Sequence, residues 1–370
     1  MMRGMWRRAV LLIFLAACGG ATVTRPPPHP PGPPGPTMRA HFIDVGQGDA
    51  TLLEFPCAAV LIDTGGELDP GFDSTAALRD YLDAFFARRT DLAQTLALLV
   101  ITHPHVDHTR GIPMVLERYH VTHVIDDGLV RSSGGEQARF LHDWLRAHPE
   151  VGHEDVHAAA APPRGLTDDV IDPVRCENVD PEIRVLWGQV DSDPGWPIDA
   201  FGKRPFDNEN NHSVVVRVDF GQSSFLFPGD LEEQAIADLV HAYQPTGLLD
   251  VDVYKVGHHG SRNGTTGPEL AAMTPRIAVI SAGPPTRHWD WTAWQYGHPS
   301  KRIVKLLSER VSDRRASLSV LAGERREEFS EFSVEQAIYA TAWDGTIVIV
   351  ADTGGRIHVE KKPLVNRSAR

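Results

Sequence analysis

The sequence predicts a mixed α/β domain built in layers, and three observations support this fold class. Short apolar runs punctuated by glycine, aspartate and proline predict strands. Between them lie segments with apolar residues at helical spacing, such as residues 74–89. Two strand segments, residues 213–220 and 223–229, are separated only by Gly221 and Gln222, which is the spacing of a β-hairpin. A hairpin among mixed helices and strands favours a layered domain over a purely parallel sheet.

The predicted elements follow one another in mixed order along the chain. Strands are predicted at residues 40–45, 51–55, 58–63, 96–102, 121–126, 183–190, 213–220, 223–229, 250–256, 276–281, 346–350 and 356–360. Helices are predicted at residues 74–89, 111–119, 135–147, 232–242, 266–273 and 300–311. Residues 127–209 are rich in proline and aspartate and predict a long insertion over one side of the site.

Length and composition indicate a folded protein of one large domain or two. The 370 residues are 42% hydrophobic and 23% charged, as in ordinary globular proteins. We expect a main domain over residues 39–312 and a small β extension over residues 313–370. The formal net charge is −13, whereas proteins that bind duplex nucleic acid are usually broadly basic. Any contact with nucleic acid must therefore be local. The sequence does not indicate an oligomeric state.

The beginning of the chain predicts export. Residues 1–17 combine a basic start with an apolar run too short to cross a bilayer, and small residues precede Cys18. This pattern resembles a bacterial lipoprotein signal, in which the cysteine is acylated; an ordinary secretory signal is the alternative. Residues 18–38 are rich in proline and favour an extended spacer, although a flexible tail fits as well. We expect a lipoprotein of the periplasm, outer membrane or cell surface that contacts the membrane only through its anchor.

The remaining two cysteines leave two possibilities open. Cys57 and Cys176 could pair outside the cytoplasm, or both could be buried free thiols. Three cysteines in all are too few for a disulfide scaffold.

Residues 103–108, with the sequence HPHVDH, carry the strongest chemical signal. They directly follow a predicted strand, so their side chains project from a loop at a sheet edge. Three imidazoles and one carboxylate within this run suit borderline divalent cations such as zinc. Because histidine makes up only 18 of the 370 residues, this arrangement is not expected by chance.

Other metal-binding side chains lie at the ends of predicted strands, and each has a structural alternative. Asp230 follows Pro-Gly and could instead cap the next helix. His212 could lie in a solvated turn. His258 and His259 stand between two glycines that leave their imidazoles uncrowded.

These residues resemble the metallo-β-lactamase superfamily and, within it, the hydrolase domain of the competence DNA-uptake protein ComEC. The superfamily motif HxHxDH is present as His103, His105, Asp107 and His108. The other matching segments are FIDVGQGDA at residues 42–50, LIDTG at 61–65, FPGD at 227–230, KVGHHGS at 255–261 and GHP at 297–299. The resemblance extends from about residue 41 to about residue 360. The membrane spans of the uptake channel have no counterpart here, so we do not expect transport.

The resemblance implies an αββα sandwich with a site for two divalent metal ions, zinc or alternatively manganese. The implied ligands are His103, His105 and His212 for one ion, and Asp107, His108 and His258 for the other, with Asp230 bridging. The sequence cannot choose between His258 and His259. Members of the subgroup often lack a histidine at the position of His212.

Further roles are implied around the ions. Asp63 would not bind an ion itself but would orient a side chain that does. Asp107, His259 and His298 are the expected catalytic residues, and Lys255 and Ser261 are expected to bind substrate. Two ions can activate a shared water and stabilise charge on the attacked group, so no side-chain nucleophile is needed.

The resemblance favours a phosphodiesterase or nuclease acting on an anionic phosphodiester, with nucleic acid as one candidate substrate. The first alternative is ester or amide hydrolysis, as in lactonases and β-lactamases. A non-catalytic binding lipoprotein with a silent site is the second.

Overall fold

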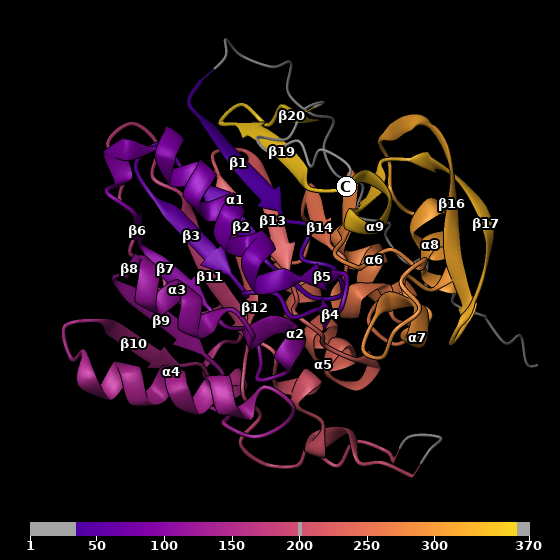
Figure 1. Ribbon diagram of the computed structural model, residues 1–370, viewed down its shortest axis with the longest axis horizontal. Helices are drawn as coiled ribbons and strands as arrows, with labels where there is room; N and C mark the ends of the chain where they lie inside the picture. Colours follow the sequence, from indigo (N-terminus) through magenta and orange to yellow (C-terminus); the bar gives the residue numbers. More distant parts are fainter. Residues whose placement is uncertain (1–34, 199–201, 361–370) are drawn as a thin grey trace, which may run out of the picture. The chain divides into compact units, whose positions relative to one another are not determined.

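Two β-sheets packed face to face form the centre of the protein, and helices cover their outer faces (Figure 1). The computed structural model describes residues 35–198 and 202–360. The first sheet contains, in spatial order, β10 (Gly152–Asp155), β9 (His123–Asp126), β7 (Leu98–Val100), β3 (Ala59–Ile62), β2 (Thr51–Glu54), β1 (Thr37–Phe42), β19 (Ile347–Asp352) and β20 (Ile357–Val359). The second sheet contains β11 (Glu182–Trp187), β12 (Val215–Phe220), β13 (Ser223–Phe227), β14 (Val253–Lys255), β15 (Ile277–Ile280) and β18 (Ile338–Ala340).

Alternation of side chains along the strands assigns each face of the first sheet. Val60 of β3 belongs to the core between the sheets, whereas its neighbour Leu61 packs on the outer side. Phe42 of the first sheet faces Phe227 of the second, with ring centroids 6.2 Å apart. Strands that are apolar on both faces therefore bury one face in the sandwich and the other under helices.

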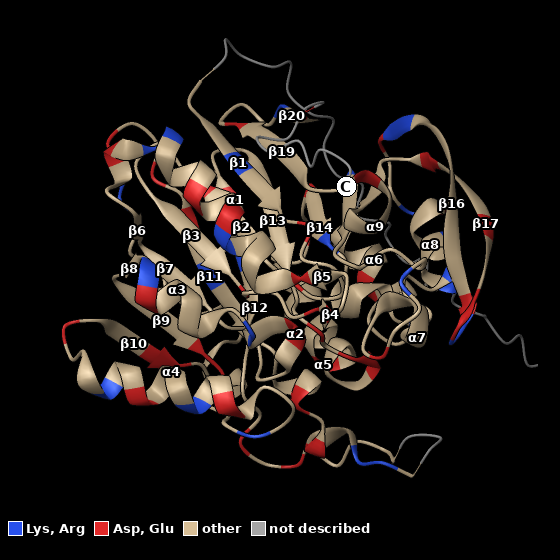
Figure 2. Cartoon of the chain, in the orientation of Figure 1, with Lys and Arg blue, Asp and Glu red and all other residues tan. Residues whose placement is uncertain are grey.

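The helices cover both outer faces. They are α1 (Ser74–Arg88), α2 (Val106–Thr109), α3 (Ile112–Arg118), α4 (Gly135–Ala147), α5 (Glu233–Tyr243), α6 (Gly267–Met273), α7 (Ala293–Tyr296), α8 (Lys301–Ser308) and α9 (Thr341–Asp344). Leu78 of α1 and Val115 of α3 pack with the outer residues of the first sheet, and α5 and α6 pack on the second. Acidic and basic residues are interspersed along α1 and α4, which present mixed charge to solvent (Figure 2). The αββα order confirms the predicted fold class.

The end of the chain differs from the prediction. A separate extension was expected from residue 313, but β18 and β19 are strands of the two central sheets. Only the hairpin of β16 (Arg314–Arg325) and β17 (Glu328–Gln336) lies outside them. The boundary at residue 313 is therefore corrected, because every residue of β19 is buried and pairs with β1. Two further short pairs are β4 (Leu68–Asp69) with β5 (Phe72–Asp73), and β6 (Thr95–Leu96) with β8 (His120–Val121).

The predicted export signal, Cys18 and most of the proline-rich segment lie outside the described residues. The first strand begins at Thr37, so the predicted linker overlaps it by two residues. Within the described part of the chain, none of the helices combines the length and the apolar character needed to cross a bilayer.

Cys57 and Cys176 form a disulfide. It joins the turn between β2 and β3 to the segment that precedes β11, and therefore links the first sheet to the second.

Parallel strands bring distant parts of the sequence to one edge of each sheet. In the first sheet β3, β7, β9 and β10 run parallel, so Asp63, His103, Asp126 and Asp155 lie at or just beyond their carboxyl ends. In the second sheet β13, β14 and β15 are also parallel. Such edges are where α/β folds place their functional side chains.

Candidate metal centre

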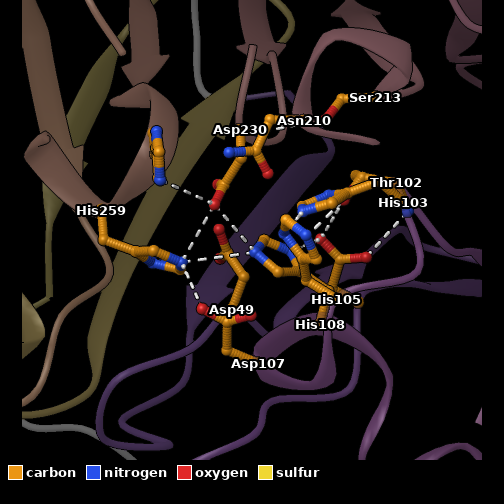
Figure 3. Close-up of polar contacts among 12 residues, drawn as sticks. Asp49, Thr102, His103, His105, Asp107, His108, Asn210, Ser213, Asp230 and His259 are labelled. Carbon is orange, nitrogen blue, oxygen red and sulfur yellow. Dashed lines mark hydrogen bonds and ion pairs between the residues drawn. The ribbon is translucent and has the colours of Figure 1, made fainter. Parts of the chain in front are cut away.

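A cluster of imidazoles and carboxylates lies where the carboxyl edges of the two sheets meet (Figure 3). His108 Nε2 lies 3.3 Å from both His259 Nε2 and Asp230 Oδ2. Asp107 Oδ2 lies 3.3 Å from His259 Nε2. Neighbouring ligands around a tetrahedral zinc ion are separated by about 3.3 Å, given bonds of about 2.0 Å. The four side chains are therefore spaced as ligands of one ion.

Asp63 holds the imidazole of His108 from outside the cluster. Its Oδ2 accepts from His108 Nδ1 and from Thr102 Oγ1, both at 2.8 Å, and its Oδ1 accepts from the Thr102 N–H. Because the Thr102 hydroxyl donates to Asp63, it can accept from His103 Nδ1, 3.1 Å away. Both imidazoles are thus held through Nδ1 and turn Nε2 inward, as outer partners commonly hold metal-ligating histidines. This is the place that the sequence analysis expected for Asp63.

His259, rather than His258, belongs to the cluster. Its Nδ1 donates to the carbonyl of Ser281 at 2.9 Å, which directs Nε2 toward Asp107 and Asp230. His258 Nε2 lies 3.8 Å from Asp230 Oδ2, and its side chain is 20% exposed. The expected roles are therefore exchanged: His259 takes the ligand position and His258 lines the cavity. Both residues have positive φ, 49° and 52°, and sequence spacing does not reveal how such a turn directs two adjacent side chains.

Asp230 lies between the imidazoles with one oxygen free of partners. Its Oδ2 contacts His108 and His259, whereas Oδ1 is buried and has no hydrogen-bond partner. The cap of α5 is Glu232, so Asp230 does not serve as the helix cap considered as its alternative role. A buried carboxylate oxygen without a partner is costly unless a cation binds it, and this site therefore fits a metal ion.

A second pair of nitrogens lies beside the cluster. His103 Nε2 and His105 Nδ1 are 3.0 Å apart, and both residues follow β7. Asn210 lies beside Asp230 in Figure 3, and its Oδ1 is buried without a partner while its Nδ2 donates to Glu232. Two imidazoles and an amide oxygen thus offer three further donor atoms. The sequence analysis did not select Asn210.

His212 lies away from the cluster, so its prediction as a ligand is corrected. Its Nδ1 accepts the N–H of Val190 at 3.0 Å, and its Nε2 donates to the carbonyl of Phe206 at 2.8 Å. Both ring nitrogens are therefore occupied by backbone groups. The segment Glu209–His212 is a 3-10 helix, in which residues two positions apart point in different directions. Asn210 faces the cavity for this reason and His212 does not.

Burial and nearby charge act in opposite directions on the imidazoles. Burial lowers the pKa of His103 and His105. Burial also opposes charge on His108 and His259, but Asp230 and the other nearby carboxylates outweigh it, raising the pKa of His259 to about 10 and that of His108 well above its ordinary value. The cluster therefore attracts positive charge, and a metal ion would have to displace these protons.

Close packing of two loops positions Asp107. The Asp49 N–H donates to the Asp107 carbonyl at 2.9 Å. A Cβ atom on Gly66 would lie 2.0 Å from the Asp107 Cα, so only glycine fits at that position.

The cluster opens on a cavity of about 510 Å³. Side chains from loops and helices that follow strands of both sheets line it, among them His105, Asp107, Arg110, Asn210, Asp230, His258, His259, Trp291, Tyr296 and His298. His298 is buried in the wall, and its Nδ1 lies 3.3 Å from Gln47 Nε2. His298, which the sequence analysis expected to be catalytic, thus lies in the wall of the cavity on which the cluster opens.

Lys255 and Ser261 do not line this cavity, so their expected role in substrate binding is corrected. Lys255 is buried at the end of β14, where its ammonium group pairs with Asp49 and donates to the carbonyl of Val256. The hydroxyl of Ser261 donates to Asn263 Oδ1 at 2.8 Å. A buried lysine beside a buried aspartate serves charge compensation in the fold.

The cavity residues that the sequence analysis did not select include Arg110, Trp291 and Tyr296. Arg110 is the second residue after the HxHxDH run, and that proximity was an available signal. No local pattern distinguishes Trp291 or Tyr296.

The comparisons with known proteins agree with this geometry. The family model described as the metallo-beta-lactamase superfamily matches residues 43–283. ComE operon protein 3 of Bacillus subtilis is 30% identical over 280 residues, covering 72% of this chain and 30% of that protein. Recombination protein 2 of Haemophilus influenzae is 27% identical over 268 residues, covering 72% of this chain and 26% of that protein.

The chain thus spans less than a third of the length of either relative. The crystal structure of human tRNase Z, short form, is 13% identical with a TM-score of 0.34, covering 73% of this chain and 88% of that one. The family model covers well over half of the chain and includes the metal cluster, and the chain belongs to the metallo-β-lactamase superfamily.

Proposed function

We propose that the protein is a metal-dependent hydrolase of phosphodiester bonds, and that nucleic acid is its substrate class. The observation that carries this proposal is the partnerless Asp230 Oδ1, held among inward-facing imidazoles in the wall of an open cavity. Such a carboxylate is expected where cations bind, and the cavity gives a substrate access to them.

The chain supplies enough donors for two ions. Asp107, His108, His259 and Asp230 form one group, and we assign His103, His105 and Asn210 to a second ion beside it. Nitrogen and carboxylate donors suit zinc, and manganese is the alternative. Divalent ions bound there would supply activation of water and neutralisation of charge on a phosphoryl group.

Arg110 favours an anionic substrate. Its guanidinium lines the cavity, where its Nε donates to the carbonyl of Gly66 at 2.6 Å. This bond holds the planar cation beside the metal cluster. Planar guanidinium groups match the oxygens of a phosphate, and a neutral lactone or amide does not need such a group.

Aromatic side chains at the cavity favour a nucleotide over a simple phosphate ester. Trp291 and Tyr296 line it, and Trp291 is 64% exposed. Exposed aromatic rings beside a phosphate-binding site stack on nucleobases with little sequence preference. The overall net charge of −13 requires that this binding be local.

His298 is positioned to donate a hydrogen bond to the substrate. The amide of Gln47 donates to its Nδ1, which leaves the ring hydrogen on Nε2. Burial lowers the pKa of His298 well below its ordinary value, so the ring is neutral. A neutral Nε2–H can contact the leaving oxygen.

We also propose that the protein is exported and anchored by a lipid on Cys18. The disulfide between Cys57 and Cys176 supports an oxidising compartment. We expect Cys18→Ala to release the protein from the membrane fraction. Unchanged fractionation of that variant would refute the anchor.

The hydrolase proposal is tested on purified protein loaded with zinc or manganese. We expect cleavage of bis-p-nitrophenyl phosphate and of single-stranded DNA or RNA, and a loss of at least about 100-fold in Asp230→Asn. His241→Gln, at an exposed position on α5, is the matched control. Hydrolysis of nitrocefin or a homoserine lactone without phosphodiester cleavage would support the ester or amide alternative. Failure to bind divalent metal would support the binding-protein alternative.

A further inference from the structure

A second group of potential metal ligands lies outside the main cavity. Asp126 ends β9, Asp155 ends β10, His153 lies on β10, and His142 lies on α4. One ligand atom from each lies within 4.8 Å of the others. None of the four lines the main cavity, and the two histidines line a separate depression of about 250 Å³. We propose that these four side chains form a zinc site that clamps α4 to the edge of the first sheet.

The spacing of these atoms argues for an ion between them. His142 Nε2 and His153 Nε2 each lie 3.2 Å from the same oxygen, Asp126 Oδ2, and His153 Nε2 lies 3.3 Å from Asp155 Oδ1. Both contacts to Asp126 are hydrogen bonds at the long end of the usual range, and the hydrogen bond between His108 and Asp63 is shorter, at 2.8 Å. Separations of 3.2–3.3 Å match the edges of a zinc tetrahedron, about 3.3 Å, and also match the main cluster.

The fold explains why these residues converge. Strands β9 and β10 are parallel, with Asp126 directly paired with Asp155, so their two carboxylates emerge at the same edge. Two adjacent carboxylates repel each other unless a cation lies between them, and the two histidines complete a set of two nitrogens and two oxygens. The side chains of His142 and His153 are 19% and 27% exposed, so an ion can reach them from solvent.

The position of α4 links this site to the main cavity. The first turn of α4 follows Ser133 and Gly134: the Ser133 hydroxyl accepts the Val106 N–H, and the Gly134 N–H donates to the Pro104 carbonyl. The start of the helix is thus bonded to the loop that carries the HxHxDH run. A zinc ion on His142 would hold the middle of the same helix. The site is therefore a structural clamp beside the catalytic loop, and it would exist whatever the substrate of the main cavity.

The test measures zinc binding by the full chain with the main site disabled by Asp107→Asn and Asp230→Asn. We expect addition of His142→Gln and His153→Gln to lower bound zinc by about one ion per chain, as measured by equilibrium dialysis and elemental analysis. Cobalt should give a visible absorption band in the parent that this variant loses. Zinc should raise the melting temperature of the parent and leave that of the variant unchanged.

The control removes two exposed histidines elsewhere, His120→Gln and His241→Gln, in the same background. Any zinc that still binds at the disabled main site is the same in the parent and in the variants, so it does not affect the difference in zinc content between them. If the double glutamine variant does not fold, Asp155→Asn alters a side chain that is 48% exposed and should weaken zinc binding at least tenfold. Equal zinc content and equal affinity in the parent, variant and control would show that the four residues form only an ion-pair network.

Discussion

Individual side chains at the metal cluster differ in role even when they are adjacent in sequence. His259 is held by the Ser281 carbonyl and contacts both carboxylates of the cluster, whereas His258 lies on the cavity wall. We expect His259→Gln to weaken metal binding by about 10-fold to 100-fold or more, since it removes a ligand nitrogen. His258→Gln should keep the metal and alter only the turnover of substrate. Calorimetric titration with zinc distinguishes them, and equal losses in both variants would contradict this assignment.

Asn210 and His212 form a second informative pair. Asn210→Ala removes a buried amide oxygen that has no protein partner, so we expect weaker binding of the ion at His103 and His105. His212→Gln leaves that group intact but disturbs hydrogen bonds to two backbone groups. It should lower the free energy of unfolding by about 1–3 kcal/mol with unchanged metal content. Metal analysis and urea unfolding measure the two effects separately. Full metal affinity in Asn210→Ala would remove Asn210 from the ligand set.

At the scale of single elements, the turn that carries His258 and His259 is supported by α6. The Gly257 N–H donates to the Tyr254 hydroxyl, which lies 3.4 Å from Glu269 Oε1. Glu269 belongs to the capping box of α6 with Thr266. One buried carboxyl group thus serves both a helix start and the support of a metal-binding turn.

Glu269 makes the stability of this element depend on pH. Burial raises its pKa to about 8 from 4.5. Between these values the unfolded chain has lost the proton while the folded chain keeps it, so rising pH favours unfolding. The stabilisation that protonated Glu269 contributes is fully present below pH 4.5 and is lost as pH rises to about 8. Over this range the free energy of unfolding falls by at most about 1.4 kcal/mol per pH unit.

We expect Glu269→Gln to remove this slope, because the neutral amide still accepts the Thr266 N–H. Urea unfolding at pH 5, 6.5 and 8 measures the difference between the two proteins. The variant should approach or exceed the parent in stability at pH 8. Parallel curves at all three values would show that Glu269 ionises normally in the folded protein.

At the scale of the whole molecule, the disulfide links the two sheets at the end opposite the metal cluster. Cys57 lies in the turn before β3, and the metal-supporting Asp63 follows the same strand. The two cysteines are 119 residues apart. Closing so long a loop restricts the unfolded chain, which corresponds to roughly 4–5 kcal/mol in the chain-entropy account.

The paired variant Cys57→Ser/Cys176→Ser should therefore be less stable by up to that amount while binding zinc with unchanged affinity. Unfolding in urea and calorimetric titration provide the two measurements. A large loss of metal affinity in the folded variant would mean that the packing of the sheets depends on the disulfide. Equal stability with and without it would contradict the entropic contribution.

The arrangement of the whole chain also shows the limit of local patterns. Phe42 at the end of β1 pairs with Ile347 at the start of β19, and these residues are 305 positions apart in the sequence. No local signal indicates that the two strands are neighbours. The prediction of a separate end from residue 313 failed for this reason. The core strands and most helices were predicted well because periodic burial is a local property; the predicted helix at residues 135–147, for example, matches α4.

The layered fold class and the metal-binding run at residues 103–108 could be predicted from the sequence, because strand periodicity and ligand types are local properties. Three further features became evident in the folded chain: His259 rather than His258 joins Asp230, Asn210 rather than His212 faces the cavity, and Lys255 neutralises Asp49. The direction of each of these side chains depends on the turn that carries it and on which distant strand ends lie opposite. The spacing of residues along the sequence specifies neither the turn conformation nor the opposing strand ends.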